Sequence, residues 1–461
     1  MNIQYISAID AYSAANNGAL LLDVREELEV SDIWIDMDNI QYLPSSSLKE
    51  LNGKIPRDRE IIVCCAIGIA SEKVAIMLME NSYENVSVLE NGLVAWKLAN
   101  LPLKSRNEIP CRCQCHNNKK NTMKIKKENV RKIFDNFSNI RVLIIGDVML
   151  DDYITGDVTR ISPEAPVPVL NIKTRYACLG GAANVALNIK SLGATPVLCS
   201  VIGKEKKSED FLAIMKKENI TDIGVIQSEN RILTTKYRAI GNNMQLLRLD
   251  DEVTHPLSQQ DKNNFLEVLT DIIHSPQKID VIIFEDYDKG IITEHIIEKV
   301  VSLAQEKSIP VLVDPKKRNF QHYRNIDLFK PNWKELTEGL RIGNGAWKDE
   351  HLLEKVKQFM IEKQHKQLLL TLSGDGIVLY RYENNTFFSD HIPACLRNVT
   401  DVSGAGDTVI SVAALCMVMG IEGKDMAMLS NLAGGLVCEE IGVVAVNKEK
   451  LIQEAMTTGG G

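Results

Sequence analysis

The chain of 461 residues lacks several features that would each have decided its class. It has no apolar run long enough to span a bilayer, and its N-terminus lacks the basic-then-apolar order of a signal peptide, so we expect a cytoplasmic protein. It also lacks a basic excess. The formal net charge of −8 argues against nucleic acid or an anionic membrane as the main partner. The ten cysteines are not spaced as a disulfide framework, and we predict reduced thiols.

The chain contains no G-x-x-x-x-G-K-[ST] motif, so a P-loop phosphate site is excluded. Another phosphate motif is present in residues 399–408. Gly404, Ala405 and Gly406 have almost no side chain, so their N–H groups can approach an anion at a helix N-terminus. Asp407 follows in the first helical turn, where a carboxylate can accept the proton of an attacking hydroxyl. Alone, this motif could also be a glycine-rich turn with a helix-capping aspartate.

A second signature upstream favours the catalytic interpretation. Gly180 and Gly181 permit a tight backbone, and Asn184 offers a donor and an acceptor suited to sugar hydroxyls. Two further motifs follow, an N-x-x-E element at 332–335 and a glycine turn at 371–376. In this order the four motifs resemble those of the PfkB/ribokinase family of carbohydrate kinases.

The resemblance implies ATP and Mg²⁺ as cofactors, with Asp407 as general base and Gly404, Ala405 and Gly406 as the anion cradle. A requirement for a monovalent cation stays open. We predict no metal site made by protein side chains alone. The positions that the resemblance assigns to ATP and Mg²⁺ are Lys316, Asn332, Trp333, Lys334, Glu335, Thr371, Ser373, Gly374 and Gly376.

Longer segments resemble one branch of this family, the kinase half of the bifunctional ADP-heptose synthesis enzymes. They are residues 146–153, 159–169, 234–238, 245–250, 286–290 and 313–316. This resemblance implies phosphorylation of D-glycero-D-manno-heptose 7-phosphate at its anomeric hydroxyl, for ADP-heptose and the lipopolysaccharide core. A kinase acting on ribose or a fructose phosphate is the alternative. The H-x-G-H motif of the nucleotidyltransferase half does not occur, and we predict no adenylyltransferase activity.

The predicted sugar-phosphate site combines carboxylates, small residues and cations. Its members are Asp147, Asp151, Arg160, Gly180, Gly181, Asn184, Lys236, Arg238, Asp286 and Lys289. A sugar that carries a phosphate needs cationic partners, although each of these cations alone could equally be a solvated surface charge.

Apolar runs that end in polar residues predict an α/β fold. We expect a ribokinase-like parallel sheet between helices at 138–457, with the ligands at the carboxyl edge of the strands. Residues 166–172 and 234–238 are typical of exposed strands. In the resembled family such strands form a lid over the sugar and often a homodimer interface.

The first hundred residues resemble a rhodanese-like domain, smaller and also α/β. The resemblance lies in residues 20–26, 61–71 and 88–96, with Cys65 at the position of the sulfur-carrying thiol. Ala66 and Ala70 stand where active sulfurtransferases usually carry arginine, so we interpret residues 1–106 as a degenerate domain. A sulfur-relay or sensor protein is the alternative function. Residues 107–137 have linker composition, with a basic run and a cluster of Cys111, Cys113, Cys115 and His116.

Overall fold

The structure is a computed structural model of the whole chain. It describes residues 3–25, 30, 33–44, 55–65, 69–99, 101–105, 123–164, 167–242, 244–343, 347–383, 386–395, 397, 399–421, 423–440 and 442–460. The chain divides into two compact units, Met1–Cys113 and Gln114–Gly461. Within the described ranges no helix is both long and apolar enough to cross a membrane. The cysteine cluster at 111–116 lies outside the described residues.

The smaller unit contains a five-stranded sheet whose order is β1-β6-β5-β2-β4, with every pair parallel. Its central strands are short apolar runs that are buried along their whole length, as expected for a parallel sheet covered on both faces. The strands are β1 (Gln4–Ile6), β2 (Leu20–Asp23), β4 (Ile40–Tyr42), β5 (Ile61–Cys64) and β6 (Val86–Leu89), beside the pair β3 (Ile33–Ile35) and β7 (Leu103–Ser105). The helices are α1 (Ala8–Asn16), α3 (Ile69–Glu80) and α4 (Gly92–Leu98).

The larger unit is built on a nine-stranded sheet of order β13-β12-β9-β16-β17-β18-β19-β20-β21. The pairs from β13 to β19 are parallel, and β20 and β21 add an antiparallel edge. The strands are β9 (Arg141–Gly146), β12 (Thr195–Ile202), β13 (Thr221–Gln227), β16 (Val281–Glu285), β17 (Val311–Asp314), β18 (Leu328–Phe329), β19 (Gln367–Thr371), β20 (Ile377–Glu383) and β21 (Thr386–Ile392).

Helices cover this sheet on two sides and form two hydrophobic cores. One core contains buried side chains of α5 (Lys127–Asn136), α6 (Ala182–Ser191), α7 (Lys206–Lys217), α12 (Ala405–Val418), α13 (Lys424–Val437) and α14 (Lys448–Thr458). The other contains those of α8 (Gln259–His274), α9 (Glu294–Lys307), α10 (Trp333–Gly339) and α11 (Glu350–Lys363). This arrangement leaves the carboxyl ends of the parallel strands together at one edge, where ligands bind in such folds.

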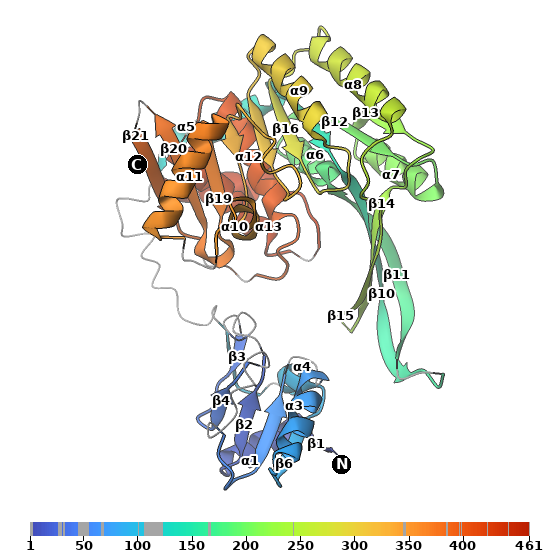
Figure 1. Cartoon of the computed structure of the whole chain (residues 1–461), viewed down its shortest axis with the longest axis vertical. Coiled ribbons are helices and arrows are strands. Elements are labelled where there is room, and N and C mark those ends of the chain that lie inside the picture. The colour runs from blue at the N-terminus through green and yellow to red at the C-terminus, as the bar shows by residue number, and fades with distance from the viewer. Residues whose placement is uncertain are drawn as a thin grey trace. The chain divides into compact units, whose positions relative to one another are not determined.

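Four longer strands form a separate sheet of order β11-β10-β14-β15, which projects from the body of the larger unit (Figure 1). They are β10 (Val148–Ile161), β11 (Pro168–Gly181), β14 (Thr234–Gly241) and β15 (Met244–Asp251). Both segments predicted as exposed strands belong to it, so the expected β lid is confirmed, but residues 234–238 are buried or half-buried and not exposed. β10 follows directly after β9, and the lid therefore grows from the carboxyl edge of the main sheet.

The predicted linker is wrong in its last part. Strand β8 (Met123–Lys126) and helix α5 belong to the larger unit, where Val130 and Phe134 enter the hydrophobic core. The spacing i, i+4 places both side chains on one helix face. Their burial makes the segment a packed helix, although its many charged residues suggested a solvated linker. Asp425 also accepts hydrogen bonds from the backbone N–H groups of Lys124 (3.0 Å) and Ile125 (3.0 Å), which fastens β8 to α13.

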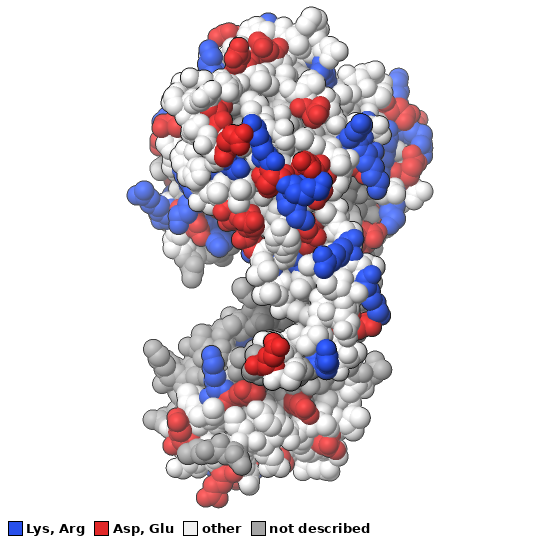
Figure 2. Space-filling view, turned by 90° about the vertical axis from the view of Figure 1, so that its right-hand side faces the viewer, with Lys and Arg blue, Asp and Glu red and all other residues white. Residues whose placement is uncertain are grey.

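Lys and Arg are interspersed with Asp and Glu over the face of the larger unit that Figure 2 shows. Opposite charges at short range screen one another, so this face presents no continuous basic field of the kind that binds a nucleic-acid backbone.

Candidate active site

Adjacent strands of the large sheet end in a row of residues at the carboxyl edge. Gly146 ends β9, Glu285 ends β16 and Asp314 ends β17, and the register pairs Gly146 with Glu285 and Glu285 with Asp314. Paired residues of parallel strands face the same side of the sheet. Helix α12 contacts both β16 and β17, so its N-terminus lies over the two acidic strand ends.

Asp407 stands in the first turn of α12 and is 4% exposed. Its carboxylate accepts hydrogen bonds from Asn184 Nδ2 (2.7 Å) and from the hydroxyl group of Tyr287 (2.8 Å). Burial raises the pKa of Asp407 to about 6, partly against the two donors, which favour the charged form. A carboxylate whose pKa lies just below neutrality suits a general base, because it is mostly ionised at pH 7 and still accepts a proton readily.

The glycine motif before α12 allows Asn184 to lie close to the helix N-terminus and to reach Asp407. Gly404 has a φ of 79°, in the left-handed region that favours glycine, and a Cβ atom there would lie 2.7 Å from Asn184 Nδ2. The two signatures are in direct contact, since Asn184 on α6 donates to the carboxylate of Asp407 on α12. Asn184 orients Asp407, whereas the sequence suggested a role on the sugar.

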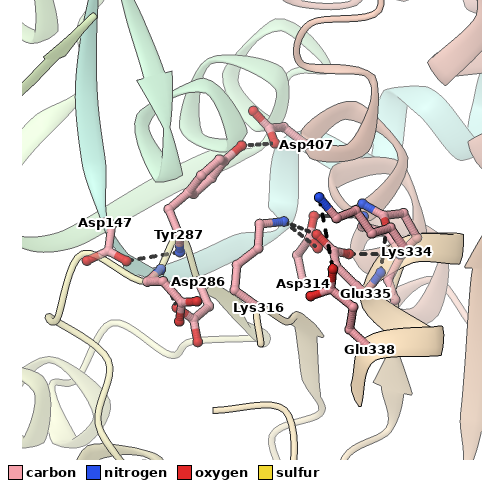
Figure 3. A network of polar contacts seen from close by, with 12 residues as sticks. Asp147, Asp286, Tyr287, Asp314, Lys316, Lys334, Glu335, Glu338 and Asp407 are labelled. Atoms are coloured by element: carbon pink, nitrogen blue, oxygen red, sulfur yellow. Dashed lines mark hydrogen bonds and ion pairs between the residues drawn. The ribbon is translucent and has the colours of Figure 1, made fainter. Parts of the chain in front are cut away.

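Tyr287 was not assigned a role from sequence. Figure 3 shows its side chain reaching from the loop after β16 to Asp407. The ammonium groups of Lys316 (5.2 Å) and Lys236 (5.9 Å) lie near its ring, close enough for cation–π attraction. The D-Y-x-K-G segment was visible in the sequence, but nothing local indicated that its aromatic side chain meets the carboxylate.

Lys316, one of the predicted ATP and Mg²⁺ residues, lies beside Asp314. Lys330 Nζ lies 2.7 Å from one carboxylate oxygen of Asp314, and Lys316 Nζ lies 3.9 Å from the other. Lys316 also forms an ion pair with Glu335 (Figure 3). The flanking carboxylates raise the pKa of Lys316 despite its burial, so it is charged. These cations could offset phosphate charge near Asp407.

Asn332 and Glu335 form a capping box at the start of α10. Asn332 Oδ1 accepts from the backbone N–H of Glu335 (2.9 Å), and Glu335 accepts from the backbone N–H of Asn332 (2.8 Å). Both polar side chains are thereby engaged with protein groups. Trp333 packs against the core beside them, while Lys334 is exposed, with 83% of its side chain accessible.

The glycine turn lies next to the capping box, because Thr371 pairs with Asn332 in an isolated parallel bridge. Ser373, Gly374 and Asp375 form a short 3₁₀ helix, and Gly376 has a φ of 88°. A Cβ atom on Gly376 would lie 2.2 Å from the carbonyl oxygen of Ile392, so the close approach of β21 requires glycine. The turn and the N-x-x-E element are thus brought together.

Three carboxylates, from Glu285, Asp314 and Asp407, each place an oxygen within 4.8 Å of the others. Burial, and repulsion by the other two carboxylates, raise the pKa of Glu285 well above its ordinary value. Both Glu285 oxygens and Asp314 Oδ1 are buried and have no hydrogen-bond partner among the described residues. Orphaned carboxylate oxygens are the donors that hard divalent cations prefer, so these residues fit Mg²⁺. Sequence reasoning missed Glu285, because no motif contains it.

Two carboxylates that were predicted on the sugar are engaged by protein groups. Asp147 accepts from the backbone N–H groups of Tyr287 (2.9 Å), Lys289 (3.1 Å) and Ile291 (3.2 Å). Asp286 accepts from Asn319 Nδ2 (2.8 Å) and the Tyr323 hydroxyl (3.0 Å), and burial raises its pKa to about 7. Both side chains organise the loop that carries Tyr287.

The lid brings part of the predicted sugar-phosphate site together. Asp151 on β10 forms an ion pair with Arg238 on β14, and Gly180 lies against it, because a Cβ atom there would be 2.4 Å from Asp151 Oδ2. Gly181 is the N-cap of α6 and has a φ of 60°. Lys289 Nζ lies 2.7 Å from Glu252.

Lys236 is half-buried beside Asp151 on the neighbouring strand, and burial lowers its pKa. Among the described residues no ion pair of Lys236 is found, and its ammonium group lies near the ring of Tyr287. Arg160 is not brought to the site. It is exposed near the far end of β10, about 30 Å along the strand from Asp151.

In the smaller unit, Cys65 follows β5 and is 4% exposed. Its sulfur accepts a hydrogen bond from the backbone N–H of Ser71 (3.4 Å), at the start of α3. Asp23 and Arg25 form a buried ion pair (2.6 Å) at the end of β2. Ala66 lies outside the described residues. Ala70 lies in the first turn of α3, and its methyl group supplies no positive charge for an anion near Cys65.

A carboxylate at a helix N-terminus, above the carboxyl edge of a parallel sheet with a projecting β lid, defines a ribokinase-like class of protein. Residues 139–450 match the pfkB family carbohydrate kinase, and the chain belongs to that family. Residues 7–99 match the rhodanese-like domain, so the expected pairing of the two domains is confirmed.

Similar proteins include the bifunctional protein HldE of Rhodospirillum rubrum, which is 34% identical over 315 residues, covering 68% of this chain and 62% of the relative. HldE of Methylobacillus flagellatus is 36% identical over 314 residues, covering 68% and 62%. HldE of Histophilus somni is 35% identical over 330 residues, covering 70% and 66%. The chain thus spans less than two thirds of the length of these relatives.

Two solved structures share the fold of the larger unit. Phosphofructokinase-2 from Escherichia coli in complex with potassium aligns with a TM-score of 0.56 at 18% identity, covering 69% of this chain and 98% of that one. The Arabidopsis thaliana ribokinase complexed with ribose and ATP aligns with a TM-score of 0.51 at 17% identity, covering 69% and 98%. At these identities the likeness establishes the fold, and the predicted ribokinase-like architecture is confirmed.

Proposed function

We propose that this protein is an ATP-dependent kinase that phosphorylates D-glycero-D-manno-heptose 7-phosphate at its anomeric O1, giving the 1,7-bisphosphate. The observation that carries the chemistry is Asp407, buried at the N-terminus of α12 with two donors and a pKa of about 6. The heptose assignment is supported by the resemblance of the lid and strand-end segments and by the HldE relatives. The reaction would take place in the cytoplasm and serve ADP-heptose and lipopolysaccharide core synthesis.

In this mechanism Asp407 accepts the proton of the sugar hydroxyl as its oxygen attacks the γ-phosphate. Asn184 and Tyr287 hold the carboxylate in place, so that it is oriented before the sugar arrives. The backbone N–H groups of Gly404, Ala405 and Gly406 face the charge that spreads over the transferring group. Mg²⁺, held by the acidic strand ends, would neutralise phosphate charge during the transfer.

Other charged residues of the site would bind the nucleotide and the sugar phosphate. Lys316 and Lys330 supply positive charge on the nucleotide side, close to Asp314. On the lid side, Lys236 would pair with the 7-phosphate of the sugar, while Asp151 and Arg238 stand beside it. Closure of the lid over the sugar would exclude water, which otherwise competes for the γ-phosphate.

The lid also supports a homodimer. Leu247 and Leu249 on β15 are 53% and 56% exposed, and Ile172 on β11 is 48% exposed. Alternation along β15 places both leucines on one face of the lid sheet, where a second copy could bury them. We expect sedimentation of the full chain to give a dimer, and Leu247→Asp together with Leu249→Asp to give a monomer.

The test of the function is ATP consumption by the full chain with Mg²⁺ and a panel of sugars and sugar phosphates. Turnover confined to the heptose 7-phosphate, with the 1,7-bisphosphate as product, supports the proposal. Preference for ribose or a fructose phosphate would keep the mechanism and refute the heptose assignment. Absence of turnover with every sugar would favour a ligand-sensing role for the kinase fold.

A further inference from the structure

Asn188 on α6 is a fully buried amide that joins three segments of the larger unit. Its Oδ1 accepts hydrogen bonds from the backbone N–H of Val446 (3.0 Å) and from the hydroxyl group of Thr408 (3.0 Å), the residue after Asp407 on α12. Its Nδ2 donates to the backbone carbonyl oxygen of Asn184 (3.0 Å) and to Asn184 Oδ1 (3.3 Å), one helical turn earlier. Because the side chain is fully buried, it can influence a ligand only through these protein groups.

Two backbone groups determine which way each of the two amides is turned. A main-chain N–H can only donate, and a main-chain carbonyl oxygen can only accept. The N–H of Val446 therefore requires the oxygen of Asn188, and the carbonyl group of Asn184 requires its nitrogen. Since that nitrogen also faces the side chain of Asn184, this side chain presents its oxygen there, which leaves Nδ2 for Asp407 (2.7 Å). The orientation of Asn184 is thus set from the side away from the base.

We propose that Asn188 is a positioning residue for phosphoryl transfer, which keeps the amide nitrogen of Asn184 directed at Asp407 whether the base is ionised or protonated. Without Asn188, the amide of Asn184 would be free to turn once Asp407 takes up a proton, and its oxygen would accept a hydrogen bond from the carboxylic acid. That contact would stabilise the protonated form and raise the pH at which Asp407 ionises. The role rests on the proposed function, because it matters only where Asp407 acts as a base.

The first experiment is the pH dependence of kcat/KM of the full chain at saturating Mg²⁺, with a sugar phosphate that the unchanged protein turns over. Asn188→Leu keeps a similar volume and removes both amide groups. We expect its acid limb to move upward by about one pH unit, so that kcat/KM at pH 6 falls by about fivefold. The KM for ATP should stay the same, because Asn188 is buried and touches no ligand.

Ser208→Ala is the matched variant. Ser208 lies on α7, is also fully buried, and donates a hydrogen bond to Glu205 (2.9 Å). Its replacement removes a buried polar group from the larger unit without touching the pair of amides. We expect its acid limb to stay in place.

A double-mutant cycle separates positioning from a general structural role. Asn184→Ala should itself move the acid limb upward, because the donor to Asp407 is gone. Adding Asn188→Leu to Asn184→Ala should move the limb no further, since Asn188 acts through Asn184. An unchanged acid limb in Asn188→Leu, or an equal shift with and without the Asn184 side chain, would overturn the proposal.

A measurement without substrate covers poor folding of Asn188→Leu and absence of turnover. The carboxyl group of Asp407 is titrated by carbon-13 NMR in the full chain with labelled aspartate, and its signal is identified by its loss in Asp407→Asn. Asn188→Ser, a smaller polar replacement that also lacks the amide, should show Asp407 titrating about one pH unit higher. Equal titration in Asn188→Ser and the unchanged protein would overturn the proposal. This shift in a chain that turns over no sugar would refute the proposed function and leave the link from Asn188 to Asp407 standing.

Discussion

The hydroxyl group of Tyr287 donates to Asp407 at 2.8 Å, inside a site where burial has already raised the pKa of Asp407 to about 6. Tyr287→Phe removes this donor and keeps the ring that packs near Lys236 and Lys316. A hydrogen bond to a charged group contributes about 1.5–3 kcal/mol, and each pKa unit corresponds to about 1.4 kcal/mol. The loss should therefore move the ionisation of Asp407 upward by about one to two pH units.

The direction of the change in activity follows from the protonation state that Asp407 needs as a base. Asp407 must be ionised to accept a proton, so activity falls on the acid side of its pKa. With the present pKa most of the carboxylate is charged at pH 7. In Tyr287→Phe the charged fraction at pH 7 should fall to between about one half and one tenth, and activity should recover towards pH 9.

The assay is the pH dependence of kcat/KM at saturating Mg²⁺, which reports the ionisation of the free enzyme. Tyr380→Phe is the matched control, because Tyr380 is also a fully buried tyrosine of the larger unit, and its hydroxyl group has no hydrogen-bond partner among the described residues. We expect its acid limb to stay in place. An acid limb that is unchanged in Tyr287→Phe would refute the assignment of Tyr287 as the residue that sets the ionisation of Asp407.

Three further predictions concern the base, the stability and the smaller unit. Asp407→Asn should lower turnover by about 10²–10⁴-fold while ATP binding, measured by calorimetry, persists, and substantial residual activity would remove Asp407 from the role of base. His365 is buried without hydrogen-bond partners in the described structure, and burial lowers its pKa to about 3. The unfolded chain therefore binds a proton below about pH 6.5 that the folded chain excludes, so stability falls as the pH falls. Between pH 7 and pH 5 the free energy of unfolding should fall by about 2 kcal/mol through this residue. His365→Phe should reduce that fall, as measured by urea unfolding at the two pH values. An unchanged pH dependence in His365→Phe would contradict the argument. Cys65→Ser should leave the steady-state kinase activity of the full chain as it is, and a large change would show that the rhodanese-like domain takes part in the reaction.

Local sequence predicted the parts of the site that lie within one motif. Gly404, Gly406 and Asp407 are close in the chain, and the backbone freedom of glycine before a helix is a local property. The lid strands were also predictable as strands, although only β11 has the expected exposure and β14 has no exposed residue. The capping box of α10 has a sequence signature as well, but the motif was assigned to Mg²⁺ instead.

The contacts between motifs could not be predicted in the same way. Glu285 and Asp314 meet because β16 and β17 pair in register, which depends on the order of strands in the folded sheet. Tyr287 meets Asp407 because its side chain extends from the loop after β16 to the first turn of α12 (Figure 3). The error over α5 has a similar origin, since the core that receives Val130 and Phe134 is made by segments far along the chain.

The two carboxylates that were predicted on the sugar explain how Tyr287 is held in place. Asp147 accepts three backbone hydrogen bonds from the segment 287–291, and Asp286 is fixed by Asn319 and Tyr323. A loop with this many anchors cannot shift without leaving buried carboxylate oxygens unpaired, which is costly. In the proposed mechanism, the acidic residues around β9 and β16 therefore act on phosphoryl transfer through Tyr287. They fix the donor, and the donor in turn fixes the orientation and the ionisation of Asp407.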